Sequence, residues 1–521
     1  MLTPREFTLF DSYKRDIVRI RPDEVAVPGV ISIYSCGPTV YSYQHIGNYR
    51  AAWLGDTITT VAKFLGWDVR WVMNITDVGH LVGDGDEGED KIEKGARRDN
   101  KTVEEIVNHY TDDYLLQCRR LNMDLPEDEL RPVASHYINQ QMIIALQLVL
   151  MGRAYFLDDG IYFDSKANND LQLPFSLQQE GDSAFTGREI KNRQKSPADF
   201  ALWKFVDPQS LQKWYFGAFP EALSILNEID SDLKPDGIIS RPGCPGWHSE
   251  CVAMIGTLFG FDEHNVNGIP TFSFDRLRGR KTTIDIHTGG EDHIDVHHKN
   301  EILQSEALGF HLSTYWVHNK FVLVDGKKMA KADGNTYHLN DIIAKGYDPL
   351  AYRLMLMEHL YSEQLNFTWD KLDQSNNRLL GLRKDVAQIR SMAQSHPDYT
   401  YSKDVPAKQL EVYQDVLADN LNIPLFLEKM QKLIGEVLDM VVSEKRFKTD
   451  NINLIRKLDN EVARLNLWPD IPQSLMDLAK RRVLAKSQKS YDQADRLREE
   501  IMSQGWNIGD YPWGYGLWKV R

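Results

Sequence analysis

The pattern of apolar and polar residues near the N-terminus predicts two buried strands with a helix between them. Residues 30–36 and 67–74 are short apolar segments rich in β-branched and aromatic side chains. Gly37 and Pro38 end the first segment, and the residues that follow favour a helix starting near His45. Because a strand-helix-strand unit is typical of a parallel sheet, we expect a fold that begins as doubly wound α/β.

Further along the chain the same patterns return with a polar interruption. Helical patterns cover residues 101–121, 132–152 and 296–308, and strand patterns cover 160–164, 283–286 and 315–323. Residues 165–196 are polar and irregular. We therefore expect the sheet domain to be split by an inserted connective domain.

The C-terminal part of the chain has a different pattern. Residues 372–505 are mostly amphipathic helix, with apolar positions such as Leu410, Tyr413 and Val416 spaced for one buried face. This pattern predicts an α-helical bundle. The closing segment, residues 509–518, is aromatic and rich in turn residues, so we expect it to dock on the rest of the protein.

The composition excludes several classes of protein. A chain of 521 residues is long enough for three or four domains. No apolar segment approaches the ~20 residues of a membrane span, and the N-terminus lacks the features of a signal peptide, so we expect a cytoplasmic protein without a membrane partner. The formal net charge of −14 argues against sequence-blind binding to a polyphosphate, although RNA can still be recognised through local basic patches.

Four cysteines are too few and too scattered for a disulfide framework in a chain of this length, so metal binding is the use to consider. His297 and Glu301 are four residues apart and share a helix face, and with Cys36 and Cys251 they would suit zinc. The alternatives stay open, because such a pair is often a solvated helix-surface pair and free cysteines are often small buried hydrophobes. The spacing along the chain does not prove that the four converge.

Two further segments are candidates for phosphate binding. The first, residues 36–48, joins a strand end to a helix start through glycine, and a helix N-terminus attracts phosphate. The second, residues 325–335, is a glycine-bounded loop with three lysines. An ordinary helix cap at His45 and a solvated basic loop are the competing interpretations. The acidic loop at residues 84–90 lacks the ligand positions of a calcium-binding EF-hand and is interpreted as solvated.

At these residues the chain resembles the class I aminoacyl-tRNA synthetases, and among them the cysteinyl-tRNA synthetases. His45-Ile-Gly-Asn48 and Lys328-Met-Ala-Lys-Ala332 match the two signature motifs of the class. Further matches, in order along some 300 residues, are at 36–41, 74–78, 195–204, 246–251, 285–290 and 297–301. The resemblance extends to the helical C-terminal region.

The resemblance implies a role for each matched residue. The zinc ligands, for one Zn2+ per chain, would be Cys36, Cys251, His297 and Glu301. The ATP contacts would be Thr39, His45, Gly47, Asn48, Lys328 and Lys331, of which His45, Asn48 and the two lysines would be catalytic. The cysteine pocket would be lined by Gly37, Thr76, Trp247 and His287. Cys118 and Cys244 match no metal-ligand position of the family and are expected to be structural thiols. Cys244 would be a spare thiol near the metal.

The expected activity is ATP-dependent activation of L-cysteine, with Mg2+ accompanying ATP, followed by transfer to tRNA(Cys). Two alternatives are a cysteine ligase acting on an amino-sugar acceptor and a catalytically silent relative that binds RNA or zinc. The silent relative is considered because the chain departs from the family motifs at three positions. Asn48 stands where the family often has histidine, and Ala330 and Ala332 stand where hydroxyl residues are usual. A monomer is favoured.

The resemblance also suggests a division of the chain. We expect a Rossmann catalytic domain at 1–120 and 241–325, a connective insertion at 121–240, a signature-lysine loop and stem-contact region at 326–375, a helical anticodon-binding bundle at 376–485 and a tRNA-contacting segment at 486–521. The C-terminal region has local positive charge for RNA, although acidic residues interrupt it: Arg481, Arg482, Lys486, Lys489, Arg496 and Arg498. A solvated helix face is the alternative interpretation.

Overall fold

The structure is a computed structural model of the chain. It describes residues 4–79, 90–169, 171, 194–259, 265–266, 269–270, 282–330, 334–396, 399–402 and 404–520. Most of the polar segment predicted at 165–196, and most of the acidic loop at 84–90, lie outside the described residues. None of the described helices combines the length and apolarity that a membrane span requires.

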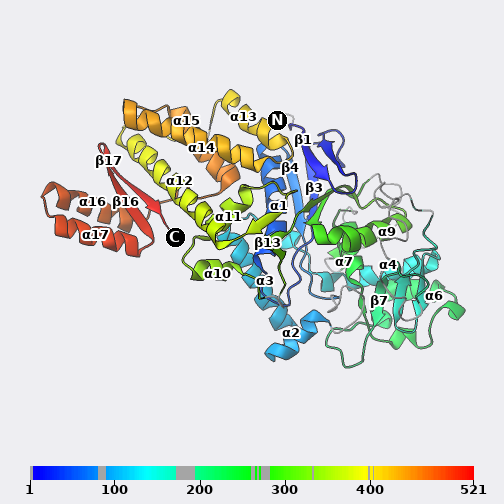
Figure 1. The fold of residues 1–521 in the computed structure, drawn as a ribbon. Coiled ribbons are helices and arrows are strands. Elements are labelled where there is room, and N and C mark those ends of the chain that lie inside the picture. The colour runs from blue at the N-terminus through cyan, green and yellow to red at the C-terminus, as the bar shows by residue number, and fades with distance from the viewer. Residues whose placement is uncertain are drawn as a thin grey trace.

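A four-stranded parallel sheet forms the centre of the molecule (Figure 1). Its order is β12-β11-β3-β4, with β3 at Val30–Ser35, β4 at Asp68–Met73, β11 at Ile284–Gly290 and β12 at Ser313–Asn319. Helix α1, Ile46–Phe64, connects β3 to β4. The predicted strand-helix-strand unit and the Rossmann-like sheet are therefore confirmed.

The two faces of the sheet belong to different cores, because side chains alternate along each strand. Ile31 and Ile33 of β3 pack in the core that contains α1, whereas Tyr34 of the same strand packs in the core that contains α7 and α9. Helix α7 spans Trp247–Phe259, and α9 spans Lys299–Ala307. Burial on both faces explains why the central strands are continuous apolar segments in the sequence.

An antiparallel sheet is inserted between β4 and β11 of the central sheet and lies at one end of the molecule (Figure 1). Its strands are β5 at Ala154–Leu157, β6 at Gly160–Phe163, β7 at Ala201–Phe205 and β8 at Gly243–Pro245, covered by α4 at Ile138–Leu150 and α6 at Pro220–Glu228. Strand β8 leads directly into α7 and returns the chain to the central sheet. The helix predicted at 132–152 starts later, at Ile138, after a 3-10 turn at Ala134–Tyr137.

The single strand predicted at 315–323 is wrong, because the chain turns at Lys320 and Phe321. Strand β12 ends at Asn319, and Val322–Val324 forms β13 in a second sheet with β14, Lys327–Lys328, and β15, Leu365–Phe367. The guanidinium of Arg50 donates to the carbonyl oxygens of Lys320 and Phe321, at 2.9 and 3.0 Å. The amide of Lys320 donates to the carbonyl oxygen of Tyr361 at 2.9 Å, and the carbonyl oxygen of Phe321 also accepts from the amide of Leu365 at 3.2 Å, so the chain leaves β12 here and pairs with the second sheet.

Other short elements complete the catalytic half of the chain. They are β1 at Phe7–Asp11, β2 at Asp16–Ile20, α2 at Lys91–Asp99, α3 at Val103–Arg120, β9 at Asn265–Val266, β10 at Ile269–Pro270, α10 at Leu339–Ala344 and α11 at Pro349–Met357. The helix predicted at 296–308 is α9, and a π-helical turn at Ile294–His298 precedes it.

The C-terminal half is helical, as predicted. Its helices are α12 at Trp369–Ser395, α13 at Ala407–Ala418, α14 at Ile423–Asp439, α15 at Thr449–Leu458, α16 at Gln473–Ser487 and α17 at Tyr491–Ser503. Tyr413 and Val416 are buried and Leu410 is half-buried, in agreement with the expected apolar face. Figure 1 shows α16 and α17 at the end of the molecule opposite the inserted sheet.

The aromatic tail forms a β-hairpin that docks on α12. Strand β16 spans Trp506–Tyr511 and β17 spans Gly514–Lys519. A side chain at Gly516 would meet the carbonyl oxygen of Ala387 at 2.7 Å, so glycine permits the close approach of hairpin and helix. On the other side of the hairpin, Arg482 and Lys486 of α16 bind Asp510 at 2.6 and 2.8 Å.

A buried ionic cluster joins α1 to the helical half of the chain. Asp56, whose side chain is 1% exposed, lies 3.3 Å from Nη1 of Arg353 in α11 and 2.8 Å from Nη1 of Arg464, which follows α15. Removing one member of a buried pair leaves the other charge without a partner, and this costs about 3–5 kcal/mol.

We therefore expect Asp56→Ala to lower the free energy of unfolding by about 3–5 kcal/mol, measured by denaturant unfolding. Glu436→Ala is the matched control, since its pair with Lys432 is 4.0 Å long and the two side chains are 60% and 78% exposed. An exposed pair contributes at most about 1 kcal/mol. Equal effects of the two substitutions would contradict the importance of the buried cluster.

Candidate active site and metal centre

The four metal-ligand candidates converge at the end of the central sheet. Cys36 follows β3, Cys251 lies in α7, His297 lies in the π-helical turn and Glu301 lies in the first turn of α9. One ligand atom from each of the four lies within 4.8 Å of the other three. The sulfur atoms are 3.9 Å apart, and Nε2 of His297 lies 2.8 Å from Oε1 of Glu301.

A second group of donors shares Cys36 and Glu301 with the first. Nε2 of His287 lies 2.8 Å from Oε2 of Glu301, and Nε2 of His298 lies 3.2 Å from Sγ of Cys36. The other ring nitrogen of His298, Nδ1, lies 2.7 Å from Nε2 of His318. The sequence analysis missed His298 and His318, although the doublet His297-His298 was a usable signal.

His287 was expected in the cysteine pocket. It is fully buried behind Glu301 and is not among the described residues that line the cavity.

The electrostatics of the cluster favour negative charge on one thiol and one carboxyl. Burial raises the pKa of Glu301, but the neighbouring histidines, His297 first, outweigh burial and hold that pKa well below its usual range. Burial lowers the pKa of His297, but Glu301 and Cys36 raise it to about 10. Burial raises the pKa of Cys36, yet its hydrogen bond with Cys251 and the histidines bring that pKa well below normal. Burial keeps the pKa of the Cys251 thiol well above normal.

These residues fit a zinc ion. Both carboxylate oxygens of Glu301 are buried and neither makes a hydrogen bond of ordinary geometry, despite their short contacts with two imidazole nitrogens. Lone pairs of several side chains thus point into a common space. Two sulfurs, one imidazole and one carboxylate are donors that zinc accepts. His287 and His298 contact Glu301 and Cys36 and make up the second group of possible donors.

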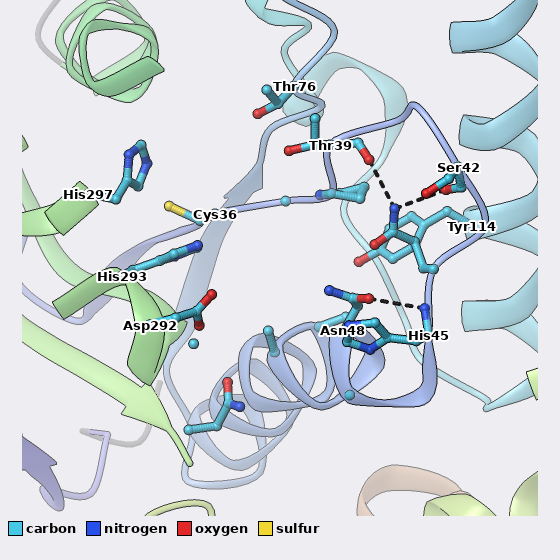
Figure 2. A pocket seen from close by; sticks show the side chains of 18 of the residues that line it. Cys36, Thr39, Ser42, His45, Asn48, Thr76, Tyr114, Asp292, His293 and His297 are labelled. Carbon is cyan, nitrogen blue, oxygen red and sulfur yellow. Dashed lines mark hydrogen bonds between the residues drawn. The ribbon is translucent and has the colours of Figure 1, made fainter. Parts of the chain in front are cut away.

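A cavity of about 330 Å³ leads from the metal-ligand candidates to the start of α1. Figure 2 shows Cys36, His293 and His297 at one end of this cavity, and His45 and Asn48 at the other. The cavity brings together most of the residues predicted from the motifs: Gly37, Thr39, His45, Gly47, Asn48, Thr76, Trp247 and Lys328.

Asp292, His293 and Tyr114 also line this cavity and were missed. Tyr114 comes from α3, and no motif marks it. Asp292 and His293 follow Gly290, the last residue of β11. The end of a parallel strand is where ligands often bind, and this position could have indicated both residues.

The wall nearest the metal-ligand candidates combines an aromatic ring with close backbone contacts. The Trp247 ring stacks on His297, with ring centroids 4.2 Å apart. The amide of Gly37 donates to Oδ1 of Asn74, whose amide group donates to Oγ1 of Thr76. A side chain at Gly37 would meet the Asn74 carbonyl oxygen at 1.7 Å, so only glycine fits between the two strand ends.

The opposite end of the cavity is the N-terminus of α1. The backbone amide of His45 donates to Oδ1 of Asn48 at 3.0 Å, which leaves the amide group of Asn48 as a donor. A side chain at Gly47 would meet Cε of Met329 at 2.7 Å, so glycine keeps this end open. Backbone amides and the helix dipole make such an end suitable for phosphate.

The second signature segment begins beside the same cavity. The Lys328 ammonium lies 4.1 Å from the centre of the Phe321 ring, and both residues line the cavity. Asn335 accepts a hydrogen bond from the amide of Ala330 and donates to the carbonyl oxygen of Lys328. Lys331 and Ala332 lie outside the described residues, so no position is assigned to them.

Comparisons with known proteins agree with this arrangement. The family described as tRNA synthetases class I (C) catalytic domain matches residues 23–216 and 238–377. The chain is 33% identical to cysteine–tRNA ligase 1 of Burkholderia lata, over 98% of this chain and 97% of that protein. It is 29% identical to the cysteine–tRNA ligase of Thermus thermophilus, over 94% and 95% of the two chains.

Among solved structures, methionyl-tRNA synthetase of Mycobacterium tuberculosis matches with a TM-score of 0.51 and 13% sequence identity. The match covers 84% of this chain and 90% of that chain. At this level of identity, the match shows a shared fold.

The converging donors predict that metal content depends on single residues. We expect Cys251→Ser and His297→Ala to lower bound zinc from about one per chain to a small fraction, measured by elemental analysis of the purified protein. Cys244→Ser is the control, because Cys244 belongs to neither group of donors among the described residues and burial raises its pKa to about 12. Full zinc in both ligand variants would refute the assignment.

Proposed function

The chain belongs to the class I aminoacyl-tRNA synthetases and, within them, to the cysteine–tRNA ligases, and from this membership we propose the roles of its cavity residues. The observation that supports this proposal is a cavity with a Cys/Cys/His/Glu cluster at one end and a glycine-containing helix N-terminus at the other. The first end suits a thiol substrate, and the second suits a phosphate.

At the first end, Cys36, Cys251, His297 and Glu301 would hold zinc, which when bound favours the thiolate form of a coordinating thiol. Trp247 and Thr76 would enclose the cysteine side chain from the neighbouring wall. A serine hydroxyl is a harder and far less acidic donor, so the site can reject serine without an editing domain. His287 would contribute to this end through its contact with Glu301, where Nε2 lies 2.8 Å from Oε2.

At the second end, His45 and Asn48 would bind the α-phosphate of ATP at the α1 N-terminus, with Thr39 and Gly47 beside them. The cysteine carboxylate attacks the α-phosphorus, a P–O bond forms, and pyrophosphate leaves with the electrons of the broken bond. Lys328 and Lys331 would neutralise the departing pyrophosphate, and Mg2+ would accompany ATP. The protein's contribution is alignment and charge stabilisation, without a nucleophilic side chain.

In the second step a terminal ribose hydroxyl of tRNA(Cys) attacks the carbonyl carbon of cysteinyl-adenylate, and AMP leaves. We propose that the tRNA runs from the cavity along the helical half of the chain to α16 and α17. Arg481, Lys489, Arg496 and Arg498 are exposed there, whereas Arg482 and Lys486 are engaged by Asp510. The division into domains, a monomeric state and a cytoplasmic location remain part of this proposal.

The function is tested by aminoacylation of unfractionated tRNA with labelled cysteine. We expect ATP-dependent, acid-precipitable label from cysteine and none from serine at equal concentration. Protein from which zinc has been removed by chelation should lose this activity. The same protein should recover the activity when zinc is added back. Cysteine-dependent ATP–pyrophosphate exchange without charging of any tRNA would instead favour another acceptor, such as an amino sugar.

Asn48 gives the sharpest test of the phosphate end. Asn48→Asp keeps the oxygen that accepts from His45 but replaces a donor by negative charge, so we expect ATP–pyrophosphate exchange to fall roughly 10²- to 10³-fold. Asn48→His restores a donor at this position and should retain most of the rate. An aspartate variant with unchanged exchange and unchanged KM for ATP would remove Asn48 from the phosphate site.

A further inference from the structure

An exposed aromatic cluster adjoins the cavity just before the start of α1. Tyr43 is 45% exposed although it lines the cavity. Its hydroxyl lies 3.1 Å from Nε2 of His109, and its ring makes edge contacts with His109, Tyr110 and His338 at centroid distances of 5.7, 5.1 and 6.4 Å. Three neighbouring rings therefore hold Tyr43 in place while much of its surface remains open to solvent.

A basic helix lies beside this aromatic cluster. The Lys91 ammonium of α2 is 5.7 Å from the centre of the Tyr41 ring, and Arg98 donates to the Tyr110 hydroxyl at 3.0 Å. Lys94 and Arg97 of the same helix are exposed. Figure 1 shows α2 beside α3 at the edge of the molecule, away from the bundle. Two of the cations of α2 also have acidic partners in the same helix, since Arg98 donates to Asp99 at 2.6 and 2.7 Å and Arg97 lies 3.4 Å from Glu93.

We propose that Tyr43 is the stacking surface for the terminal base of the tRNA 3′ end, and that α2 contacts the adjoining phosphates. This inference rests on the proposed function and names the place where the RNA enters the cavity. A single-stranded end is bound by exposed aromatic faces together with nearby cations, since every base offers a π-face and every linkage offers a charge.

The position of the ring matches the chemistry of transfer. The terminal ribose must approach the adenylate from outside, after ATP has already occupied the α1 end of the cavity. Tyr43 lies two residues before His45, at the same end of the cavity but in an exposed part of its wall. A base stacked there places its own ribose next to the phosphate end, whereas the adenine of ATP requires a more enclosed surface.

The test separates adenylate formation from transfer. We expect Tyr43→Leu to raise the KM for tRNA in the transfer step roughly tenfold while ATP–pyrophosphate exchange, which needs no tRNA, stays within about twofold of the wild type. Tyr43→Phe keeps the ring and loses only the hydroxyl contact with His109, so it should transfer nearly as well as the wild type. Retained exchange also shows that the leucine variant is folded.

The RNA supplies the second arm of the experiment. A tRNA whose 3′-terminal nucleotide lacks its base should raise the KM of the wild-type protein by a similar factor, and should raise that of Tyr43→Leu no further. Tyr491→Leu is the control, because this exposed tyrosine of α17 is of equal size and lies in another part of the molecule. Tyr491→Leu should change the KM for tRNA by the same factor whether or not the terminal base is present.

Three results would overturn the inference. They are unchanged transfer by Tyr43→Leu, additive effects of the variant and the missing base, and a raised KM for ATP in exchange, which would assign the ring to ATP instead. Failure of the wild-type protein in cysteine-dependent exchange is a separate outcome, since it would reject the proposed function rather than this RNA contact.

Discussion

Buried charge at the carboxyl end of the sheet is the constraint on which this structure depends. Glu301 is fully buried, and although burial raises its pKa and that of Cys36, the neighbouring histidines hold the pKa of Glu301 well below its usual range, while the hydrogen bond with Cys251 and the histidines bring the pKa of Cys36 below normal. Buried charge is stable only when it is paired or bound to a metal. The end of β3, helix α7 and the turn before α9 must therefore meet at one place, and the inserted sheet serves this by returning the chain to α7 beside Cys36.

Helix α1 connects that metal-ligand cluster to the rest of the molecule. Its N-terminus closes the other end of the cavity, and Arg50, one turn further on, donates four hydrogen bonds to carbonyl oxygens. Two of these carbonyls belong to Lys320 and Phe321, and the Phe321 ring supports Lys328. Asp56, two turns later, is joined to the helical half through Arg464. One helix thus connects the proposed phosphate site to the segment that carries Lys328 and to the helical half of the chain.

Hydrogen bonds close to Asn48 and Ala330 compensate for the departures of these two residues from the usual signature motifs. Asn48 lacks the positive charge of histidine, but its oxygen accepts from the His45 amide and its amide group can still donate to phosphate. Ala330 lacks a hydroxyl, yet its backbone amide is held by Asn335, which also binds the carbonyl oxygen of Lys328. The side chain of Asn335 thus holds the backbone of the described part of the loop through two hydrogen bonds.

The sequence by itself determined the local elements and the chemistry of the candidates. The apolar segment at 30–36, the helix start at His45 and the donor types of Cys36 and Glu301 follow from residue patterns of short range. Only the tertiary structure decided that Cys36 meets Cys251, which lies 215 positions later in the chain, that His287 contacts Glu301, and that the strand predicted through Phe321 is broken. The physical reason is that these outcomes depend on partners distant in sequence: Lys320 and Phe321 pair with Tyr361 and Leu365 instead of continuing β12, and packing decides which donors share a space.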